Sequence, residues 1–254
     1  MYDFDNRVII VTGGASGIGK SAAARLANFG AIVVIADVDD HRGNTTVEEL
    51  IGRGGKGLYV RADVSKEADV KHLVDATLDR YGKLDGAFNN AGVEQSIQPL
   101  HQIDDRQWRK VIDINLSGVF YCLKHQIPAL IANGGGSIVN TSSSLGQRAM
   151  PLAAEYIAAK HGVIGLTRAA AAEYAKQGIR VNSVLPGMTD TPMVGRAPTD
   201  PELAEMFQRV VASIPMPRLG QPEEVADAVA WLLSDASTFV TGVTLPVDGG
   251  FLAV

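Results

Sequence analysis

Val11-Thr-Gly-Gly-Ala-Ser-Gly-Ile-Gly19 joins a short β-rich run at residues 7–11 to a helical pattern that extends to about residue 29. Glycines permit a tight turn and allow a ligand to approach the backbone closely. A helix that starts at such a turn offers free N–H groups and a positive dipole end, which suit a pyrophosphate. The stretch from Gly17 to Ala22 also fits the dinucleotide fingerprint G-x-G-x-x-A, in the strand–turn–helix context that this fingerprint needs. The turn therefore predicts a dinucleotide site near the start of a βαβ unit.

Apolar strand-like runs and helical patterns alternate along the rest of the chain. The runs that predict strands are residues 7–11, 31–36, 57–62, 84–89, 137–141, 179–185 and 243–247. The patterns that predict helices after the first are 41–53, 66–81, 105–132 (with a distortion near Gly118), 153–176 and 202–212. Near-continuous apolar strands separated by helices are typical of a parallel sheet that is covered on both faces. We therefore expect one α/β domain over residues 1–254, a doubly wound Rossmann fold with a seven-stranded parallel sheet.

Composition narrows the class of protein. The 254 residues are 46% hydrophobic with a net charge of -5, and no cluster of Lys and Arg predicts a nucleic-acid partner. Cys122 is the one cysteine, so no internal disulfide can form and a reducing compartment is expected. The acidic N-terminus does not resemble a signal peptide, no apolar run is long enough for a membrane helix, and no Cys/His cluster indicates a metal. These features favour a cytoplasmic protein that binds neither membrane nor nucleic acid.

Asp37 follows the second apolar run directly, 18 residues after Gly19. An acidic residue at about this spacing binds the adenosine ribose in dinucleotide sites. A carboxylate there accepts hydrogen bonds from the ribose hydroxyls and repels a 2′-phosphate. Ser16 and Val38, where a basic side chain could favour NADP, are uncharged. The sequence therefore predicts NAD rather than NADP, although an acid in a surface loop is the ordinary alternative.

Tyr156 and Lys160 lie four residues apart in a helical pattern, so their side chains share one helix face. A phenol titrates near pH 10, and a nearby ammonium lowers that pKa by favouring the phenolate. Ser143 lies thirteen residues before the tyrosine, in the polar run Asn140-Thr-Ser-Ser-Ser144. The pair predicts a proton donor and acceptor beside a hydroxyl that can hold a substrate oxygen. On its own the pair is also compatible with a solvated helix face.

Further motifs stand in order along the chain. They are Thr12-Gly13-Gly-Ala-Ser-Gly17-Ile-Gly19, Asp63-Val64, Asn89-Asn90-Ala91-Gly92, Asn115, Ser143 with Tyr156 and Lys160, and Pro186-Gly187 followed by Thr189 and Thr191. With this order and spacing, nearly the whole chain resembles the short-chain dehydrogenase/reductase family. One position departs from the family pattern, because Thr189 stands where the family usually has Ile or Val. The family uses the backbone of that residue, so the contact with a nicotinamide carboxamide is still expected.

The resemblance implies reversible hydride transfer between a nicotinamide ring and a secondary alcohol or ketone. It implies that Tyr156 exchanges the proton, Ser143 holds the reacting oxygen, Lys160 lowers the phenol pKa and binds the ribose, and Asn115 uses a distorted helix to keep a relay water near Lys160. The cofactor contacts that it implies are Gly13, Ser16, Gly17, Ile18, Gly19, Asp37, Asp63, Val64, Asn89, Ala91, Gly92, Tyr156, Lys160, Pro186, Gly187, Thr189 and Thr191. A homotetramer is also implied.

The irregular stretch at about residues 189–221 carries five prolines and is expected to be a substrate lid. The predicted substrate contacts are Ser143, Leu145, Gln147, Met150, Met188 and Met193, with Val93, Met206 and Phe207 nearby. These residues favour a moderately hydrophobic substrate, although Arg148 or Arg196 could reach a carboxylate. Several stretches look most like family members that oxidise cyclic alcohols and diols.

Two other functions stay open at this point. One is a 3-oxoacyl thioester reductase, which would usually need NADP, a cofactor that Asp37 argues against. The other is a regulatory protein that binds NAD without turnover. Such proteins often lose a catalytic residue, whereas all four positions are filled here.

Overall fold

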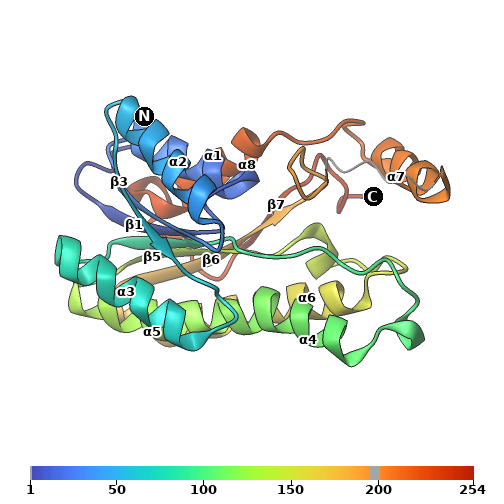
Figure 1. Cartoon of the computed structure of the whole chain (residues 1–254), viewed down its shortest axis with the longest axis horizontal. Helices are drawn as coiled ribbons and strands as arrows, with labels where there is room; N and C mark the ends of the chain where they lie inside the picture. The colour runs from blue at the N-terminus through green and yellow to red at the C-terminus, as the bar shows by residue number, and fades with distance from the viewer. Residues whose placement is uncertain (1, 195–200) are drawn as a thin grey trace.

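The computed structural model describes residues 2–194 and 201–254, apart from the side chains of residues 201–203 and 206. Seven strands form one parallel sheet in the order β3-β2-β1-β4-β5-β6-β7 (Figure 1). They are β1 (Val8–Thr12), β2 (Ile32–Asp37), β3 (Lys56–Arg61), β4 (Gly86–Asn89), β5 (Gly136–Thr141), β6 (Ile179–Pro186) and β7 (Thr244–Val247). The central strands β1 and β4 are buried at every residue, as expected of a sheet covered on both faces. The sheet confirms the predicted doubly wound α/β fold.

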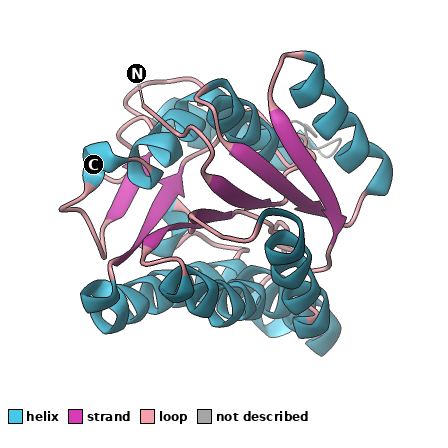
Figure 2. Cartoon of the chain, turned by 90° about the vertical axis from the view of Figure 1, so that its left-hand side faces the viewer, coloured by secondary structure: helices cyan, strands magenta, loops and turns pink. Residues whose placement is uncertain are grey.

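Helices cover both faces of the sheet (Figure 2). Their bounds are α1 (Gly17–Asn28), α2 (Asp40–Gly52), α3 (Glu67–Tyr81), α4 (Asp105–Ile112), α5 (Gly118–Ala132), α6 (Ala154–Tyr174), α7 (Pro201–Ser213) and α8 (Pro222–Leu233). The layer of α1, α2 and α8 lies on one face, and that of α3, α4, α5 and α6 lies on the other (Figure 1). The two larger apolar cores lie one on each face of the sheet, and a smaller one contains Val64, Val70 and Cys122.

The predicted helix over residues 105–132 is divided by one turn of π-helix at Asp113–Ser117, just before Gly118. The expected distortion is therefore present as a wider turn between α4 and α5. Helix α8 was not predicted, although the sequence carries a start signal for it. Pro222 stands in its first turn, and Gln221 and Glu224 form a capping box.

The strand order reverses between β1 and β4, which are neighbours in the sheet but far apart in the chain. In an open parallel sheet, ligands bind beyond the carboxyl ends of the strands at such a reversal. Helix α7 lies beyond this edge of the sheet (Figure 1). Within the described ranges, none of the helices combines the length and the apolar character that crossing a bilayer requires.

Candidate functional site

The glycine-rich turn after β1 is packed directly against the end of β4. Gly13 and Gly17 have φ angles of 63° and 50°, which favour glycine. A Cβ on Gly13 would lie 2.9 Å from the Cα of Ala91. The hydroxyl of Thr12 accepts hydrogen bonds from the backbone N–H groups of Asn90 (3.0 Å) and Ala91 (3.1 Å). This hydroxyl therefore links the two strands at the point where they part.

A cavity of about 340 Å³ begins at this turn and extends over the carboxyl edge of the sheet. Its wall contains fifteen of the predicted cofactor residues: Gly13, Ser16, Gly17, Ile18, Asp37, Asp63, Val64, Ala91, Gly92, Tyr156, Lys160, Pro186, Gly187, Thr189 and Thr191. Among the described residues, no side chain caps the start of α1, and Ser16, Gly17 and Ile18 at this start line the cavity. A glycine cradle, a free helix N-terminus and an acid at the far end fit a dinucleotide.

Two predicted cofactor residues, Gly19 and Asn89, do not line the cavity. Gly19 does not line the cavity; its Cβ would lie 2.1 Å from the carbonyl oxygen of Gly13, so it serves close packing of α1 on the turn. Asn89 is 2% exposed and lies beneath the cavity. Its Nδ2 donates to Gln126 Oε1 and to Asn140 Oδ1, each at 3.0 Å. Asn89 therefore joins the sheet to α5, whereas Ala91 lines the cavity.

Ser143, Tyr156 and Lys160 lie together at the inner end of the cavity. Ser143 follows β5, whereas the other two residues lie on the first turns of α6. Lys160 Nζ is 5.5 Å from the centre of the Tyr156 ring and donates to the carbonyl oxygen of Thr141 at 2.8 Å. This arrangement places an ammonium over the face of the phenol ring, within the distance of a cation–π contact.

Asn115 lies in the π-helical turn, fully buried. Its side chain forms two hydrogen bonds of 2.8 Å with one residue, accepting from Val93 N–H and donating to Val93 C=O. A Cβ on Gly92 would lie 3.1 Å from Asn115 Oδ1 and 3.7 Å from Lys160 Nζ. Asn115 therefore fixes the chain after β4 beside the lysine. Val93 lines the first cavity rather than the apolar pocket described next.

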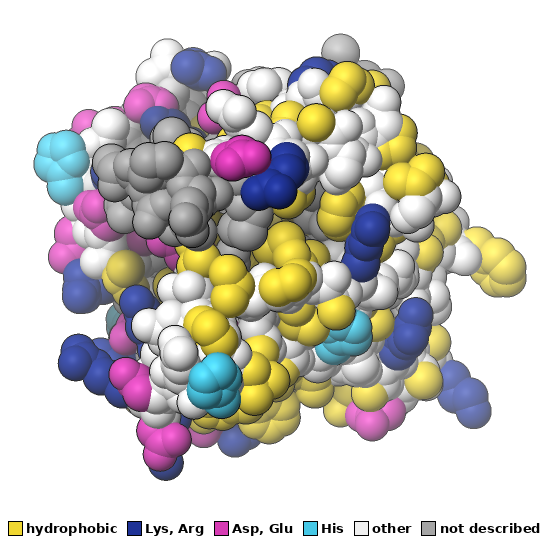
Figure 3. Space-filling model, turned by 90° about the vertical axis from the view of Figure 1, so that its right-hand side faces the viewer, with side chains coloured by type: hydrophobic (Ala, Val, Ile, Leu, Met, Phe, Trp, Pro, Cys, Tyr) yellow, Lys and Arg dark blue, Asp and Glu magenta, His cyan; other side chains and the backbone are white. Residues whose placement is uncertain are grey.

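An apolar pocket of about 220 Å³ adjoins the first cavity. Ser143 and Tyr156 each line both the cavity and the pocket. Five predicted substrate residues stand in its wall: Ser143, Leu145, Met150, Met188 and Met193. Phe207 of α7 is also present, together with Ile214 and Phe251, which the sequence did not suggest. Figure 3 shows hydrophobic side chains gathered in the middle of the face onto which the strands end.

Gln147 and Arg148 do not line this pocket, because both side chains bind elsewhere. Gln147 Nε2 donates to Thr244 Oγ1 at 2.9 Å. The Arg148 guanidinium donates to the carbonyl oxygen of Phe251 at 2.9 Å and lies 4.5 Å from the centre of its ring. Both side chains are therefore used to hold the C-terminal segment. Arg196 and the side chain of Met206 lie outside the described residues.

The predicted lid, residues 189–221, is described except for 195–200. Its two ends are tied together, because Asp190 N–H donates to Gly220 C=O at 2.8 Å and Gly220 N–H donates to Met188 C=O at 2.9 Å. The segment thus leaves the sheet edge and returns to it, carrying Met193 and α7 to the apolar pocket.

Comparison with known proteins gives the family. A family model described as enoyl-(acyl carrier protein) reductase matches residues 13–252. A short-chain type dehydrogenase/reductase from Mycobacterium ulcerans is 36% identical, with a TM-score of 0.93 over 99% of this chain and 91% of that one. The chain belongs to the short-chain dehydrogenase/reductase family.

Two other members of the short-chain dehydrogenase/reductase family are similar over their whole length. The 2,5-dichloro-2,5-cyclohexadiene-1,4-diol dehydrogenase of Sphingobium indicum (strain UT26) is 47% identical over 255 residues, which cover 100% of both chains. Carveol dehydrogenase from Mycobacterium avium, solved in complex with NAD, is 35% identical, with a TM-score of 0.93 and complete coverage of both chains. The predicted class is confirmed: an oxidoreductase of alcohols that uses a nicotinamide cofactor.

The electrostatics of this short-chain dehydrogenase/reductase differ from the sequence expectation at the tyrosine. Burial raises the pKa of Tyr156, and the Ser143 hydroxyl acts in the opposite direction. Burial also lowers the pKa of Lys160 to about 8. The lysine donates to Thr141 C=O and lies over the phenol ring, and the effect of burial on the Tyr156 pKa is the larger one. A positive charge on an oxidised nicotinamide would supply the missing attraction for the phenolate.

Lys160→Met should remove the pH dependence that the buried ammonium gives to stability. The folded pKa of about 8 lies below the ordinary 10.5, so the unfolded state binds more protons between these values and stability rises with pH across this window. The free energy of unfolding of the wild type, relative to Lys160→Met, should therefore rise by about 3 kcal/mol between neutral pH and the ordinary lysine pKa. Urea unfolding followed by circular dichroism measures this difference. Lys71→Met, at an exposed lysine of α3, is the control: the free energy of unfolding of the wild type relative to this variant should show no such rise, because both proteins keep Lys160.

Glu155 is a buried carboxylate that the sequence did not single out. It is 0% exposed, and its Oε1 accepts from the backbone N–H of Ser96 at 2.7 Å. Burial raises the pKa of Glu155, but hydrogen bonding, including the bond from the Ser96 backbone N–H, outweighs it and keeps this pKa below its usual value. The residues next to Ser96, Gln95 and Ile97, line the apolar pocket. Glu155 thus anchors one wall of that pocket to the helix that carries Tyr156.

Proposed function

We propose that the chain is an NAD-dependent dehydrogenase of uncharged cyclic secondary alcohols, which also reduces the corresponding ketones. One observation carries the proposal: Ser143 and Tyr156 line both the dinucleotide cavity and the apolar pocket. An alcohol carbon seated between these two hydroxyls would lie at the junction of the two spaces, where hydride transfer has to occur.

Tyr156, Ser143, Lys160 and Asn115 have different roles in the proposed reaction. NAD, when bound, supplies the hydride acceptor. Tyr156 Oη takes the proton of the alcohol during oxidation and returns it during reduction, and Ser143 Oγ donates a hydrogen bond to the reacting oxygen. Lys160 contributes its charge over the phenol face and a donor toward the ribose. Asn115 holds the backbone of Val93 beside the lysine and keeps the π-helical turn open for a relay water.

The preference for NAD over NADP is supported by the end of β2. The Asp37 carboxylate lines the cavity and accepts from Ala15 N–H and Asp39 N–H, each at 3.1 Å. These bonds fix a negative charge where the adenosine ribose would lie. A 2′-phosphate would be repelled there, whereas ribose hydroxyls can donate to the carboxylate.

The preference for uncharged substrates is supported by the lining of the apolar pocket, and the preference for cyclic alcohols by the names of the relatives. Leu145, Met150 and Phe207 supply apolar surface, and Glu94 is the acidic side chain of the wall. Arg148 is turned toward Phe251 and does not offer its charge to the pocket. A related diol dehydrogenase and carveol dehydrogenase are named for cyclic alcohols.

A purified-enzyme screen tests the proposal by nicotinamide absorbance. Cyclohexanol and cyclohexane diols with NAD should be turned over with a kcat/KM at least tenfold above that for hydroxycyclohexane carboxylates, because a carboxylate would have to be desolvated beside Glu94. The same alcohols with NADP should be poorer substrates. Preferred reduction of 3-oxoacyl thioesters with NADPH would instead support the reductase alternative. Inactivity on all alcohols with both cofactors would favour the regulatory alternative.

We also propose that residues 1–254 act as a single domain with the 189–221 lid, in a cytoplasmic homotetramer. Exposed aromatic side chains support the assembly: Trp108 of α4 is 43% exposed, Phe120 of α5 is 46% exposed and Phe239 is fully exposed. Large apolar side chains left on a surface are typical of protein interfaces.

A further inference from the structure

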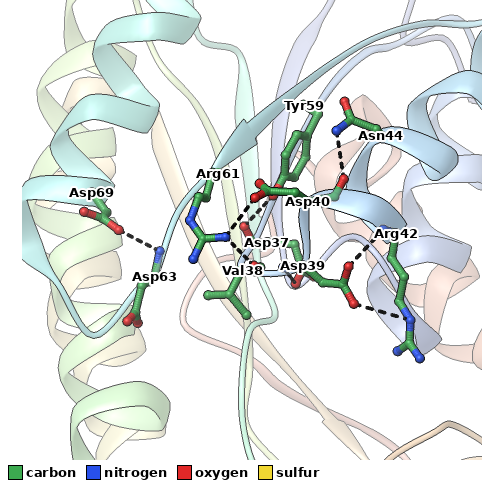
Figure 4. Close-up of polar contacts among 10 residues, drawn as sticks. All are labelled: Asp37, Val38, Asp39, Asp40, Arg42, Asn44, Tyr59, Arg61, Asp63 and Asp69. Carbon is green, nitrogen blue, oxygen red and sulfur yellow. Dashed lines mark hydrogen bonds and ion pairs between the residues drawn. The ribbon is translucent and has the colours of Figure 1, made fainter.

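The turn that follows β2 is fastened to its neighbour β3 by two side chains. Tyr59 Oη donates to the carbonyl oxygen of Asp37 at 2.9 Å and lies 2.9 Å from Asp40 Oδ1. Arg61 Nη1 donates to the carbonyl oxygen of Val38 at 2.7 Å and to Asp40 Oδ2 at 3.1 Å. Figure 4 shows both side chains directed from β3 to the turn, with Asp40 between them. The backbone of residues 37 and 38 is therefore fixed from outside the cavity.

These two backbone positions are the ones that matter for the cofactor. Asp37 and Val38 both line the dinucleotide cavity, whereas Tyr59 and Arg61 do not. Tyr59 and Arg61, here called the clamp, thus hold a part of the cavity wall without lining the cavity themselves. The clamp binds the carbonyl groups of Asp37 and Val38. The Asp37 carboxylate accepts from Ala15 N–H of the glycine-rich turn.

The packing of α2 makes room for the Tyr59 ring. A Cβ at Gly43 would lie 2.1 Å from Cε2 and 2.4 Å from Cδ2 of that ring. The ring therefore rests directly on the backbone of α2, which keeps its hydroxyl aimed at the turn. Burial, with the carboxylates of Asp40 and Asp37, also raises the pKa of Tyr59, so the hydroxyl stays a donor at working pH.

A purely stabilising role does not account for the arrangement. The side chains of Arg61 and Asp40 are 61% and 59% exposed, and an exposed ion pair contributes little to stability. All four polar contacts nevertheless end on residues 37–40, and two of them end on the carbonyl groups of the residues that line the cavity.

We propose that Tyr59 and Arg61 are positioning residues for dinucleotide selection, which hold the Asp37–Val38 turn so that the Asp37 carboxylate meets the adenosine ribose. The inference rests on the proposed use of NAD. It concerns discrimination between NAD and NADP and leaves the chemical step to other residues. Loss of the clamp lets the turn relax, weakens the ribose contacts and separates the carboxylate from the position of a 2′-phosphate.

Tyr59→Phe tests the proposal because it removes one oxygen and keeps the ring that packs on Gly43. The Kd of NADH, measured by fluorescence titration of the purified protein, should rise about five- to tenfold. The Kd of NADPH should change less than about twofold, since weaker contacts and weaker repulsion offset each other. The selectivity ratio should therefore fall. Tyr81→Phe, at a partly buried tyrosine of α3, is the matched control and should leave both constants unchanged.

The Asp37→Ala background separates positioning from a structural effect. If Tyr59 acts through Asp37, Tyr59→Phe should lower the NADH/NADPH selectivity in the wild type and leave it unchanged in Asp37→Ala. Equal weakening of NADH and NADPH, together with a matching loss in the melting temperature, would overturn the proposal, as would an unchanged ratio. A wild type that binds NADPH more tightly than NADH would instead refute the proposed cofactor preference, and it would be seen before any variant is made.

Discussion

Tyr156→Phe should lower kcat for alcohol oxidation by about 10²–10⁴-fold, the contribution typical of a positioned acid–base group. The phenol oxygen lies at the junction of the two cavities, and no other described side chain of that junction except Ser143 offers a hydroxyl. The ring itself remains, so the packing over Lys160 is retained. Steady-state kinetics with the best alcohol of the screen, and fluorescence titration with NADH, measure the two effects. The Kd of NADH should stay within about twofold of the wild type, less than the loss of one hydrogen bond.

Tyr174→Phe is the control for this variant, because Tyr174 ends the same helix at a distance from the cavities. It should retain wild-type activity. The pH profile adds a second check: because burial raises the pKa of Tyr156, oxidation by the wild type should increase with pH as the phenolate forms. Activity of Tyr156→Phe close to that of the wild type would refute the assignment.

Gly19→Ala should destabilise the protein by about 1–3 kcal/mol or more and weaken NADH binding at least tenfold. The added Cβ would lie 2.1 Å from the carbonyl oxygen of Gly13, and backbone cannot move aside as a flexible side chain can. The turn must shift away from the start of α1, which disrupts the cradle for the pyrophosphate. Urea unfolding and NADH titration measure the two losses.

Gly52→Ala is the matched control, since nothing lies within 4 Å of the Cβ it would add at the end of α2. It should bind NADH like the wild type and be at least as stable, because alanine favours helix more than glycine does. Similar behaviour of Gly19→Ala and Gly52→Ala would show that the close packing of α1 on the turn is unimportant.

The sequence predicted the sheet, most of the helices and the residues around the cavity because these depend on local patterns. Buried apolar runs and a glycine turn identify strands and the crossover to α1 without knowledge of distant contacts. The spacing of Ser143, Tyr156 and Lys160 predicted that these three would meet, whereas the place of Asn115 beside them came from the resemblance to the family. Helix α8 was missed although Gln221, Pro222 and Glu224 form a local start signal.

The remaining differences come from long-range partners that no local pattern reveals. Asn89 turns inward because Gln126 and Asn140 offer their amides from α5 and β5. Gln147 finds its partner, Thr244, 97 residues further along the chain. The raised pKa of Tyr156 and the lowered pKa of Lys160 both follow from burial, which depends on the packed structure.

The hydroxyl of Thr12, which joins the end of β1 to the chain after β4, has a consequence for how the site receives a ligand. Where the strand order reverses, β1 and β4 diverge and leave a crevice, and the two chain segments that form its sides could move independently. The Thr12 hydroxyl oxygen, which accepts from two N–H groups, connects these two segments without a bound ligand. An incoming dinucleotide therefore meets a surface that is already shaped, and little conformational entropy is lost there on association. Preorganisation at this single atom links the geometry of the sheet to the affinity of the site.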